Sequence, residues 1–360
     1  MLPGQGYLTT SDGVRLFFQV LGNGPKPVVI PNGIYLLDDF KRLADGRTII
    51  AYDLRNRGLS DPVSDTQRLT LGIHHDVDDL DAVRRHFGID LVDLIGHSYV
   101  GLTIILYAMK HPAHVNRIVQ IGPSQPNAGT QYPAHLTGAD ATLAEVGARL
   151  AQLRKQPRTP DPVEFCKKFW EILRVIYVAD PADAHRINWG RCDLPNELNF
   201  MKYWTESILP SIQSLHLAPE QLAEVKTPVL TIHGTRDRSA PYGGGRDWAL
   251  MLPNARLVTI EGAAHAPWIE DPETVFGSIE TFLDGAWPKT ARKVPDARRV
   301  GHRFWWPACC IPANADDIKR SSAPHVLVII PSRTPRTSTA RRAPPAAPPH
   351  RRSSIVPARS

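Results

Sequence analysis

The chain has 360 residues, 42% of them hydrophobic and 22% charged, and a formal net charge of +6. This composition is ordinary for a globular protein that buries a large core. No stretch reaches the roughly 20 consecutive apolar residues of a membrane span. The start of the chain, Met1 to Gly6, lacks the basic and apolar runs of a secretory signal, so neither a membrane nor a secreted location is expected.

Short apolar runs alternate with helical patterns over the first third of the chain. Strands are predicted at residues 28–30, 48–52, 92–95 and 118–121. Between them, residues 72–87 repeat apolar side chains with the period of an amphipathic helix. This alternation predicts a mostly parallel sheet with helices on both faces.

One turn in this region carries a candidate nucleophile. The apolar run that starts at Val92 leads into GHSYVG at positions 96–101, and an apolar helical pattern follows. A sharp strand-to-helix turn of this kind exposes its serine, here Ser98, and points the N–H groups of the helix's first turn at incoming negative charge. Val100 is β-branched and stiff, so it either packs beneath the turn or distorts it. The alternative for Ser98 is a simple helix N-cap.

Beyond Ser124 the strand rhythm stops until about Lys226. Helical patterns replace it at residues 139–155, 162–178, 182–189 and 197–214. This part is rich in aromatic side chains, most of which we expect to hold the helices together. Any that face Ser98 would make an apolar pocket.

Two further strands end at polar residues that complement a serine. The predicted strand at 228–234 is followed by Asp237, and the strand at 255–260 is followed by His265. Because ligand chemistry collects at the carboxyl ends of parallel strands, we expect both residues near Ser98. The alternatives are a turn aspartate and a space-filling loop histidine. His233 ends the strand before Asp237 and is a weaker base candidate.

Four motifs together resemble those of the α/β-hydrolase-fold serine hydrolases. They are GHSYVG at 96–101, HGTRD at 233–237, GAAH at 262–265 and DLRNRGLS at 53–60. The chain order Ser, Asp, His is also the order of that family. The resemblance covers residues 6–287 and implies an α/β-hydrolase fold with a helical cap inserted after the sixth strand.

The resemblance also implies the parts of the site. Ser98, His265 and Asp237 would form the triad, and the N–H groups of Tyr99 and Ile34 would form the oxyanion hole. The substrate pocket would be lined by four more residues: Asn32, Gly33, His97 and Trp268. Many relatives carry histidine where this chain has Asn32, which leaves the backbone donor and changes the polar lining.

The expected chemistry is two-step acyl transfer on a small-molecule carboxylic ester. Metal ions and organic cofactors are not required, and neither a nucleic-acid nor a membrane partner is expected. A proline-iminopeptidase-like aminopeptidase and a cofactor-free haloperoxidase or perhydrolase remain open within the fold. The aminopeptidase would need acidic cap residues, for which the candidates are Glu164, Glu171, Glu197 and Glu206. A non-catalytic ligand-binding protein is the alternative of a different class.

The end of the chain has a different composition. Residues 288–360 are rich in Pro and Arg and hold 15 Lys and Arg against 3 Asp and Glu, so they carry +12 and residues 1–287 carry −6. We therefore predict a disordered basic tail. The expected domains are a core at 1–124 and 227–287, a cap at 125–226, and the tail. Four cysteines show neither a disulfide framework nor zinc spacing, so a cytoplasmic location is expected.

Overall fold

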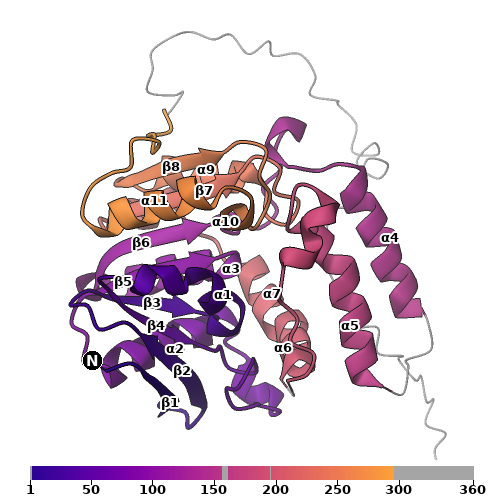
Figure 1. Cartoon of the computed structure of the whole chain (residues 1–360), viewed down its shortest axis with the longest axis horizontal. Helices are drawn as coiled ribbons and strands as arrows, with labels where there is room; N and C mark the ends of the chain where they lie inside the picture. The colour runs from indigo at the N-terminus through magenta and orange to yellow at the C-terminus, as the bar shows by residue number, and fades with distance from the viewer. Residues whose placement is uncertain (1, 156–160, 195, 296–360) are drawn as a thin grey trace, which may run out of the picture. The chain divides into compact units, whose positions relative to one another are not determined.

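The computed structural model describes residues 2–155, 161–194 and 196–295. Within them, eight strands form a sheet in the order β1-β2-β4-β3-β5-β6-β7-β8 (Figure 1). The strands are Gly4–Thr9, Arg15–Leu21, Pro27–Pro31, Thr48–Tyr52, Val92–His97, Val115–Ile121, Val229–Gly234 and Ala255–Ile260. β2 pairs antiparallel with both β1 and β4, and the other neighbours are parallel. The predicted, mostly parallel sheet is confirmed.

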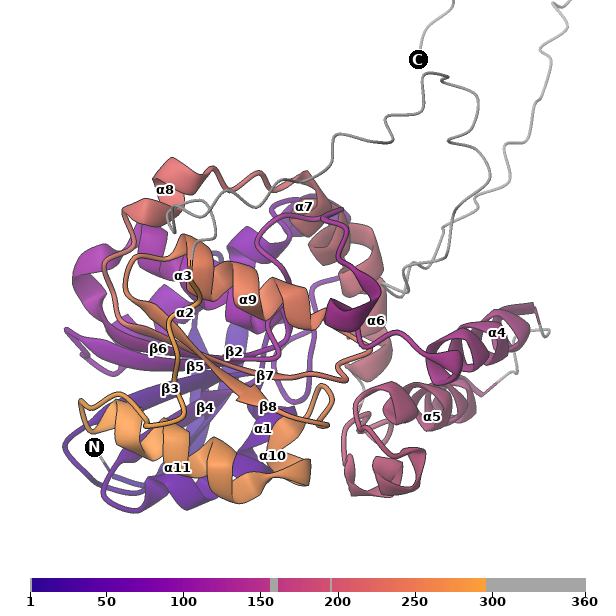
Figure 2. The ribbon, with the colours of Figure 1, turned by 90° about the horizontal axis from the view of Figure 1, so that it is seen from above.

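Every residue of the central strands β4 and β5 is buried, so both faces of the sheet are covered by helices. Figure 2 shows α1 and α11 on one side and α2, α3 and α9 on the other. These helices are Gly33–Phe40, Pro272–Leu283, Ile73–His86, Tyr99–Lys110 and Tyr242–Met251. The helix predicted at 72–87 is α2, which buries Val77, Leu80 and Val83 against the sheet.

A helical insertion, residues 122–228, separates β6 from β7. Its helices are α4 (Ala141–Lys155), α5 (Pro162–Leu173), α6 (Glu197–Tyr203), α7 (Leu209–Ser214) and α8 (Pro219–Ala223). The single helix predicted at 197–214 is interrupted by a π-helical turn, Trp204–Ile208. Pro210 explains the break, because it has no N–H for the preceding turn and its ring crowds that turn. The helix predicted at 182–189 is a 3₁₀ segment, Pro181–Arg186.

The cysteine prediction was wrong in one respect. Cys166, on α5, and Cys192, between the 3₁₀ segment and α6, form a disulfide with their Cα atoms 5.8 Å apart. Their separation of 26 positions formed no recognisable framework, because pairing depends on how the insertion folds back. Cysteine usage therefore no longer supports the predicted cytoplasmic location. Cys309 and Cys310 lie outside the described residues.

The boundary predicted for the tail was also too early. Residues 288–295 belong to the described part of the chain, and Arg292 forms an antiparallel bridge with Leu257 of β8. Both backbone hydrogen bonds of this bridge measure 2.8 Å. The rest of the predicted disordered tail, residues 296–360, lies outside the described residues.

Candidate active site

Ser98 lies at the sharp turn between β5 and α3, with φ 60° and ψ −132°. Its N–H donates to the Ile121 carbonyl of β6 at 3.0 Å, and its own carbonyl accepts the Gly101 N–H at 3.0 Å. A non-glycine residue with positive φ is strained, so the surrounding structure must hold it there. Gly96 allows the turn, because a Cβ there would lie 2.7 Å from the Val100 carbonyl oxygen.

Val100 packs beneath this turn. It is 1% exposed, belongs to α3 from its first turn, and contributes to the core on that face of the sheet. Gly101 makes the close approach instead, with a Cβ position 2.9 Å from Pro123. The chain thus forms the turn with the glycine one position later than in the common pattern.

Asp237 and His265 form a buried hydrogen-bonded pair. His265 Nδ1 lies 2.8 Å from Asp237 Oδ2, and both side chains are at most 1% exposed. Asp237 Oδ1 accepts the N–H groups of Ser239 and Ala240, each at 2.8 Å. Burial alone would raise the pKa of Asp237, but His265 and His233 lower it well below its usual value. An ionised carboxylate only accepts hydrogen bonds, so His265 carries its proton on Nδ1 and leaves Nε2 basic.

The end of β6 brings Ser98 and this pair together. Ser98 bonds to Ile121, and a Cβ at the next residue, Gly122, would lie 3.1 Å from His265 Nδ1 and 3.2 Å from Asp237 Oδ2. His97, which precedes Ser98, has its ring 4.4 Å from the His265 ring. The three predicted triad residues therefore meet at the carboxyl edge of the sheet.

His233 supports Asp237 from the other side. Its Nε2 lies 3.0 Å from Asp237 Oδ2 and 3.1 Å from the Ala240 carbonyl, so Nε2 carries the proton. Its Nδ1 is buried against α9, where a Cβ at Gly245 would lie 2.2 Å away. This histidine holds the acid in place and is not positioned as the base.

The residues expected to form the oxyanion hole differ in their backbone bonding. Tyr99 is the first residue of α3, so its N–H has no acceptor within the helix. The N–H of Ile34, in contrast, donates to Asp53 Oδ1 at 2.8 Å. Burial raises the pKa of Asp53 to about 6. The hydrogen bonds that Asp53 accepts from the N–H groups of Leu59 and Ile34 act in the opposite direction. Ile34 is thus held by a carboxylate in this structure, which the sequence did not indicate.

The four residues expected to line the pocket surround the same edge. His97 Nε2 donates to the His265 carbonyl at 3.0 Å, and burial lowers the pKa of His97 well below its usual value. The Trp268 ring lies 4.9 Å from the His97 ring. Asn32 adopts φ 68° with its Oδ1 buried and unpartnered among the described residues, and Gly33 begins α1.

Aromatic side chains of the helical insertion complete the surroundings. Tyr177 stacks on His265 at 5.3 Å, and the Trp189 ring lies 5.3 Å from His97 and 5.0 Å from Tyr177. The insertion therefore places aromatic rings against His265 and His97.

Two residues that sequence reasoning missed connect the insertion to the catalytic loops. Glu270 accepts the N–H groups of Ala264 and Ala179, both at 2.6 Å, so it joins the His265 loop to the insertion. Arg238 follows Asp237 and donates to the Val178 carbonyl and to Asp140. Neither residue lies in a recognisable motif; the only local signal for Arg238 was its position beside the acid.

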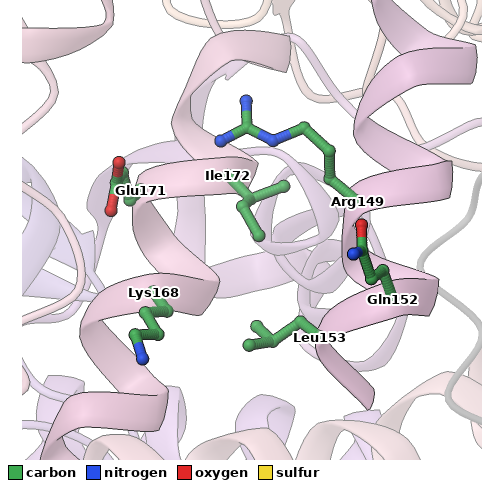
Figure 3. Close-up of a pocket in the computed structure, with 6 residues that line it drawn as sticks. All are labelled: Arg149, Gln152, Leu153, Lys168, Glu171 and Ile172. Atoms are coloured by element: carbon green, nitrogen blue, oxygen red, sulfur yellow. The ribbon is translucent and has the colours of Figure 1, made fainter. Parts of the chain in front are cut away.

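A separate hollow of about 270 Å³ lies between α4 and α5 (Figure 3). Its lining comes from Arg149, Gln152, Leu153, Lys168, Glu171 and Ile172. Figure 3 shows Arg149 reaching from α4 across Ile172. The lining includes no triad residue, so this hollow is not the candidate active site.

Neither a metal-binding cluster nor a membrane-spanning helix occurs in the described part of the chain. In residues 2–155, 161–194 and 196–295, His, Cys, Asp and Glu side chains form no group of three or more suited to a metal ion. None of the helices in those ranges has the length and apolar character needed to cross a membrane.

Comparisons with known proteins bear on the fold and the family of the chain. A model of the family described as alpha/beta hydrolase fold matches residues 26–272. A proline iminopeptidase from Heyndrickxia coagulans is 25% identical, over 78% of this chain and 98% of that protein. A bifunctional esterase/perhydrolase from Acinetobacter calcoaceticus is 24% identical, over 77% of this chain and 99% of that protein. The solved structure of an esterase from Exiguobacterium antarcticum has a TM-score of 0.59 at 18% identity, over 77% of this chain and 98% of that one, which shows likeness of fold alone.

Proposed function

Because this chain belongs to the alpha/beta hydrolase fold family and is a hydrolase, we propose that it cleaves a small-molecule carboxylic ester with Ser98, His265 and Asp237. One observation carries the proposal. The buried Asp237 carboxylate holds the Nδ1 proton of His265 at 2.8 Å beside the strained turn that presents Ser98. This arrangement makes Nε2 of His265 a base, which a serine hydroxyl needs in order to attack a carbonyl.

The mechanism has two steps. His265 accepts the Ser98 proton as the Ser98 oxygen bonds to the carbonyl carbon, and the protonated His265 then gives that proton to the departing alcohol. Water attacks the acyl-enzyme with His265 as the base again, which releases the acid and restores Ser98. Asp237 stabilises the imidazolium in both steps. The Tyr99 N–H at the start of α3 is the first oxyanion donor, and Ile34 is the second once its N–H turns from Asp53.

The surroundings of His265 favour an apolar or aromatic substrate. Tyr177, Trp189 and Trp268 lie within ring-contact distance of His97 or His265. We infer that the helical insertion acts as a cap, which brings two of these rings over the site and excludes water.

The aminopeptidase alternative has less support. Glu164 pairs with Lys168, Glu206 lies near Lys202, and Glu171 lines the outer hollow. Glu197 is buried but lies 3.6 Å from the Arg57 guanidinium, so a cation already compensates its charge. A carboxylate engaged in this way is a poor partner for a free amino terminus.

The first test is labelling with a fluorophosphonate, followed by mapping of the modified residue by mass spectrometry. We expect stoichiometric labelling at Ser98 and hydrolysis of simple aryl esters. Ser98→Ala should abolish labelling and reduce turnover about 10⁶-fold, the loss typical of a triad serine.

Ser124→Ala is the matched control. Ser124 is the serine of a second Gly-x-Ser triplet, and only its backbone makes the hydrogen bonds to Ser98 and Trp248. This variant should keep labelling and turnover. If folded wild-type protein is not labelled, the ligand-binding alternative is favoured. Cleavage of prolyl amides in preference to esters would favour the aminopeptidase. Peroxide-dependent formation of a peracid would favour the perhydrolase.

A further inference from the structure

A buried carboxylate joins the helical insertion to the core beside the site. Glu197, the first residue of α6, is 2% exposed. Its Oε1 accepts the Tyr35 hydroxyl at 2.6 Å and the Trp170 indole N–H at 3.1 Å, and it lies 3.6 Å from Arg57 Nη2. Tyr35 and Arg57 belong to the core, whereas Glu197 and Trp170 belong to the insertion, so one carboxylate connects the two parts.

Tyr35 receives a second set of contacts from the insertion. The Trp189 indole N–H donates to the Tyr35 carbonyl at 2.9 Å, and the two rings stack with centroids 5.5 Å apart and planes at 5°. The Arg57 guanidinium lies 3.8 Å from the Tyr35 ring centre on the core side. Both the backbone and the side chain of Tyr35 are therefore held by the insertion, and we call this set of contacts the Tyr35 latch.

The latch acts directly next to the expected oxyanion donor. Ile34 precedes Tyr35, and its N–H is held by Asp53 of the core. In the structure Asp53 therefore engages this N–H from the core, while the insertion restrains the same loop through Tyr35. An oxyanion donor must be placed to within a fraction of an ångström, because a misplacement of about 1 Å costs up to about a hundredfold in rate.

We propose that Glu197 and Tyr35 are positioning residues for the hydrolytic centre: with the helical insertion seated on the core, they hold the loop of Ile34 so that its N–H meets the oxyanion once it turns from Asp53. This inference rests on the proposed function. Neither residue is assigned a chemical step: Glu197 acts through Tyr35, and Tyr35 acts through the backbone of the loop that it shares with Ile34. An oxyanion hole completed by the insertion would couple seating of the insertion to catalysis.

The test is Tyr35→Phe in the full chain, which removes the hydroxyl bound by Glu197 and keeps the ring stacked on Trp189. Its matched control is Tyr132→Phe. Tyr132 also donates its hydroxyl to a carboxylate at 2.6 Å, that of Asp247, but it packs on α9. Each variant is titrated with fluorophosphonate, so that rates are expressed per competent site. The readouts are kcat and KM for an aryl ester and the affinity for an aryl trifluoromethyl ketone, which forms an oxyanion on serine.

For Tyr35→Phe we expect kcat to fall about tenfold to a hundredfold while KM stays within about twofold. The affinity for the trifluoromethyl ketone should fall by the same factor as kcat/KM, which a loss of stability alone would not produce. Tyr132→Phe should match wild type. Glu197→Gln keeps an acceptor for Tyr35 and should lose less activity than Glu197→Ala.

Other outcomes would overturn the proposal. Equal rates per labelled site in Tyr35→Phe and Tyr132→Phe would remove the latch from catalysis, and a rise in KM alone would make Tyr35 a pocket residue. If wild type itself is not labelled, the proposed function fails first. If wild type is labelled and the variants do not differ, only this inference fails.

Discussion

At the residue scale, three buried aspartates show how partners decide a charge state. Asp237 has two histidines and two N–H donors, so its pKa is lowered despite burial. Asp53 has two N–H donors and a pKa of about 6. Asp76, on α2, is fully buried near Asp79, and burial followed by that neighbouring charge raises its pKa to about 8. Only the aspartate with histidine partners is suited to stabilise an imidazolium.

Asp76 predicts a pH dependence of stability. A carboxyl with a pKa of 3.8 when unfolded and about 8 when folded favours the folded state while it is protonated, so this contribution is lost as the pH rises from about 4 to 8. The side chain introduced by Asp76→Asn stays neutral, so the free energy of unfolding of this variant should exceed that of wild type at pH 8 by at least about 1 kcal/mol, or about 2–4 °C in Tm. At pH 4 the two proteins should not differ in this way. Thermal melts across this range measure it. The control is Asp78→Asn, at an exposed position of α2, which should behave like wild type. Parallel curves of Tm against pH for Asp76→Asn and wild type would refute the raised pKa of Asp76.

At the element scale, the segment between α5 and α6 places Trp189 over the site. The disulfide fixes its far end at Cys192, and Arg174 of the insertion donates to the Trp189 carbonyl. Gly190, with φ 78°, lies so close to Trp170 that a Cβ would come within 2.2 Å of the indole. Trp189 is thus held in one position, as a ring that limits a pocket must be.

Replacement of both bridged cysteines tests this restraint. Cys166→Ser with Cys192→Ser should lower the free energy of unfolding by about 2–4 kcal/mol, because the unfolded chain regains the freedom of the closed loop. Release of Trp189 should also reduce the discrimination against bulky acyl groups, measured as the KM ratio of long-chain to short-chain aryl esters. A reductant should reproduce both effects in wild type and leave the double variant unchanged. Non-reducing peptide maps without the Cys166–Cys192 link would contradict the premise.

At the scale of the whole molecule, the chain that follows α11 packs along β8, the last strand of the sheet. Trp287 lies under the Arg256 guanidinium at 4.5 Å, Ala291 is buried, and Arg292 bridges to Leu257. These contacts cover the edge strand β8, which would otherwise present unpaired backbone groups. The segment 288–292 is therefore part of the folded unit.

Two truncated chains can measure what this segment contributes. A chain ending at residue 295 should be more stable to urea than one ending at residue 287 by about 1–2 kcal/mol, because two backbone hydrogen bonds and a buried alanine are retained. Arg292→Ala in the longer chain should preserve most of this difference, since the bridge uses backbone atoms only. Equal midpoints for the two chains would show that the bridge adds no stability.

The sequence by itself determined strands β3 to β8, the helices on both faces and the places where Ser98, Asp237 and His265 leave their strands, but not β1 and β2. These features are local: a buried strand, an amphipathic stripe or a glycine turn leaves a pattern within a few residues. The tertiary structure alone decided that Asp53 holds the Ile34 N–H, that His233 shares Asp237, and that Glu197 bonds to Tyr35 across 162 positions. It also decided the disulfide in the insertion. Such contacts join distant segments, and their partners are set by how the chain folds back, which no local pattern records.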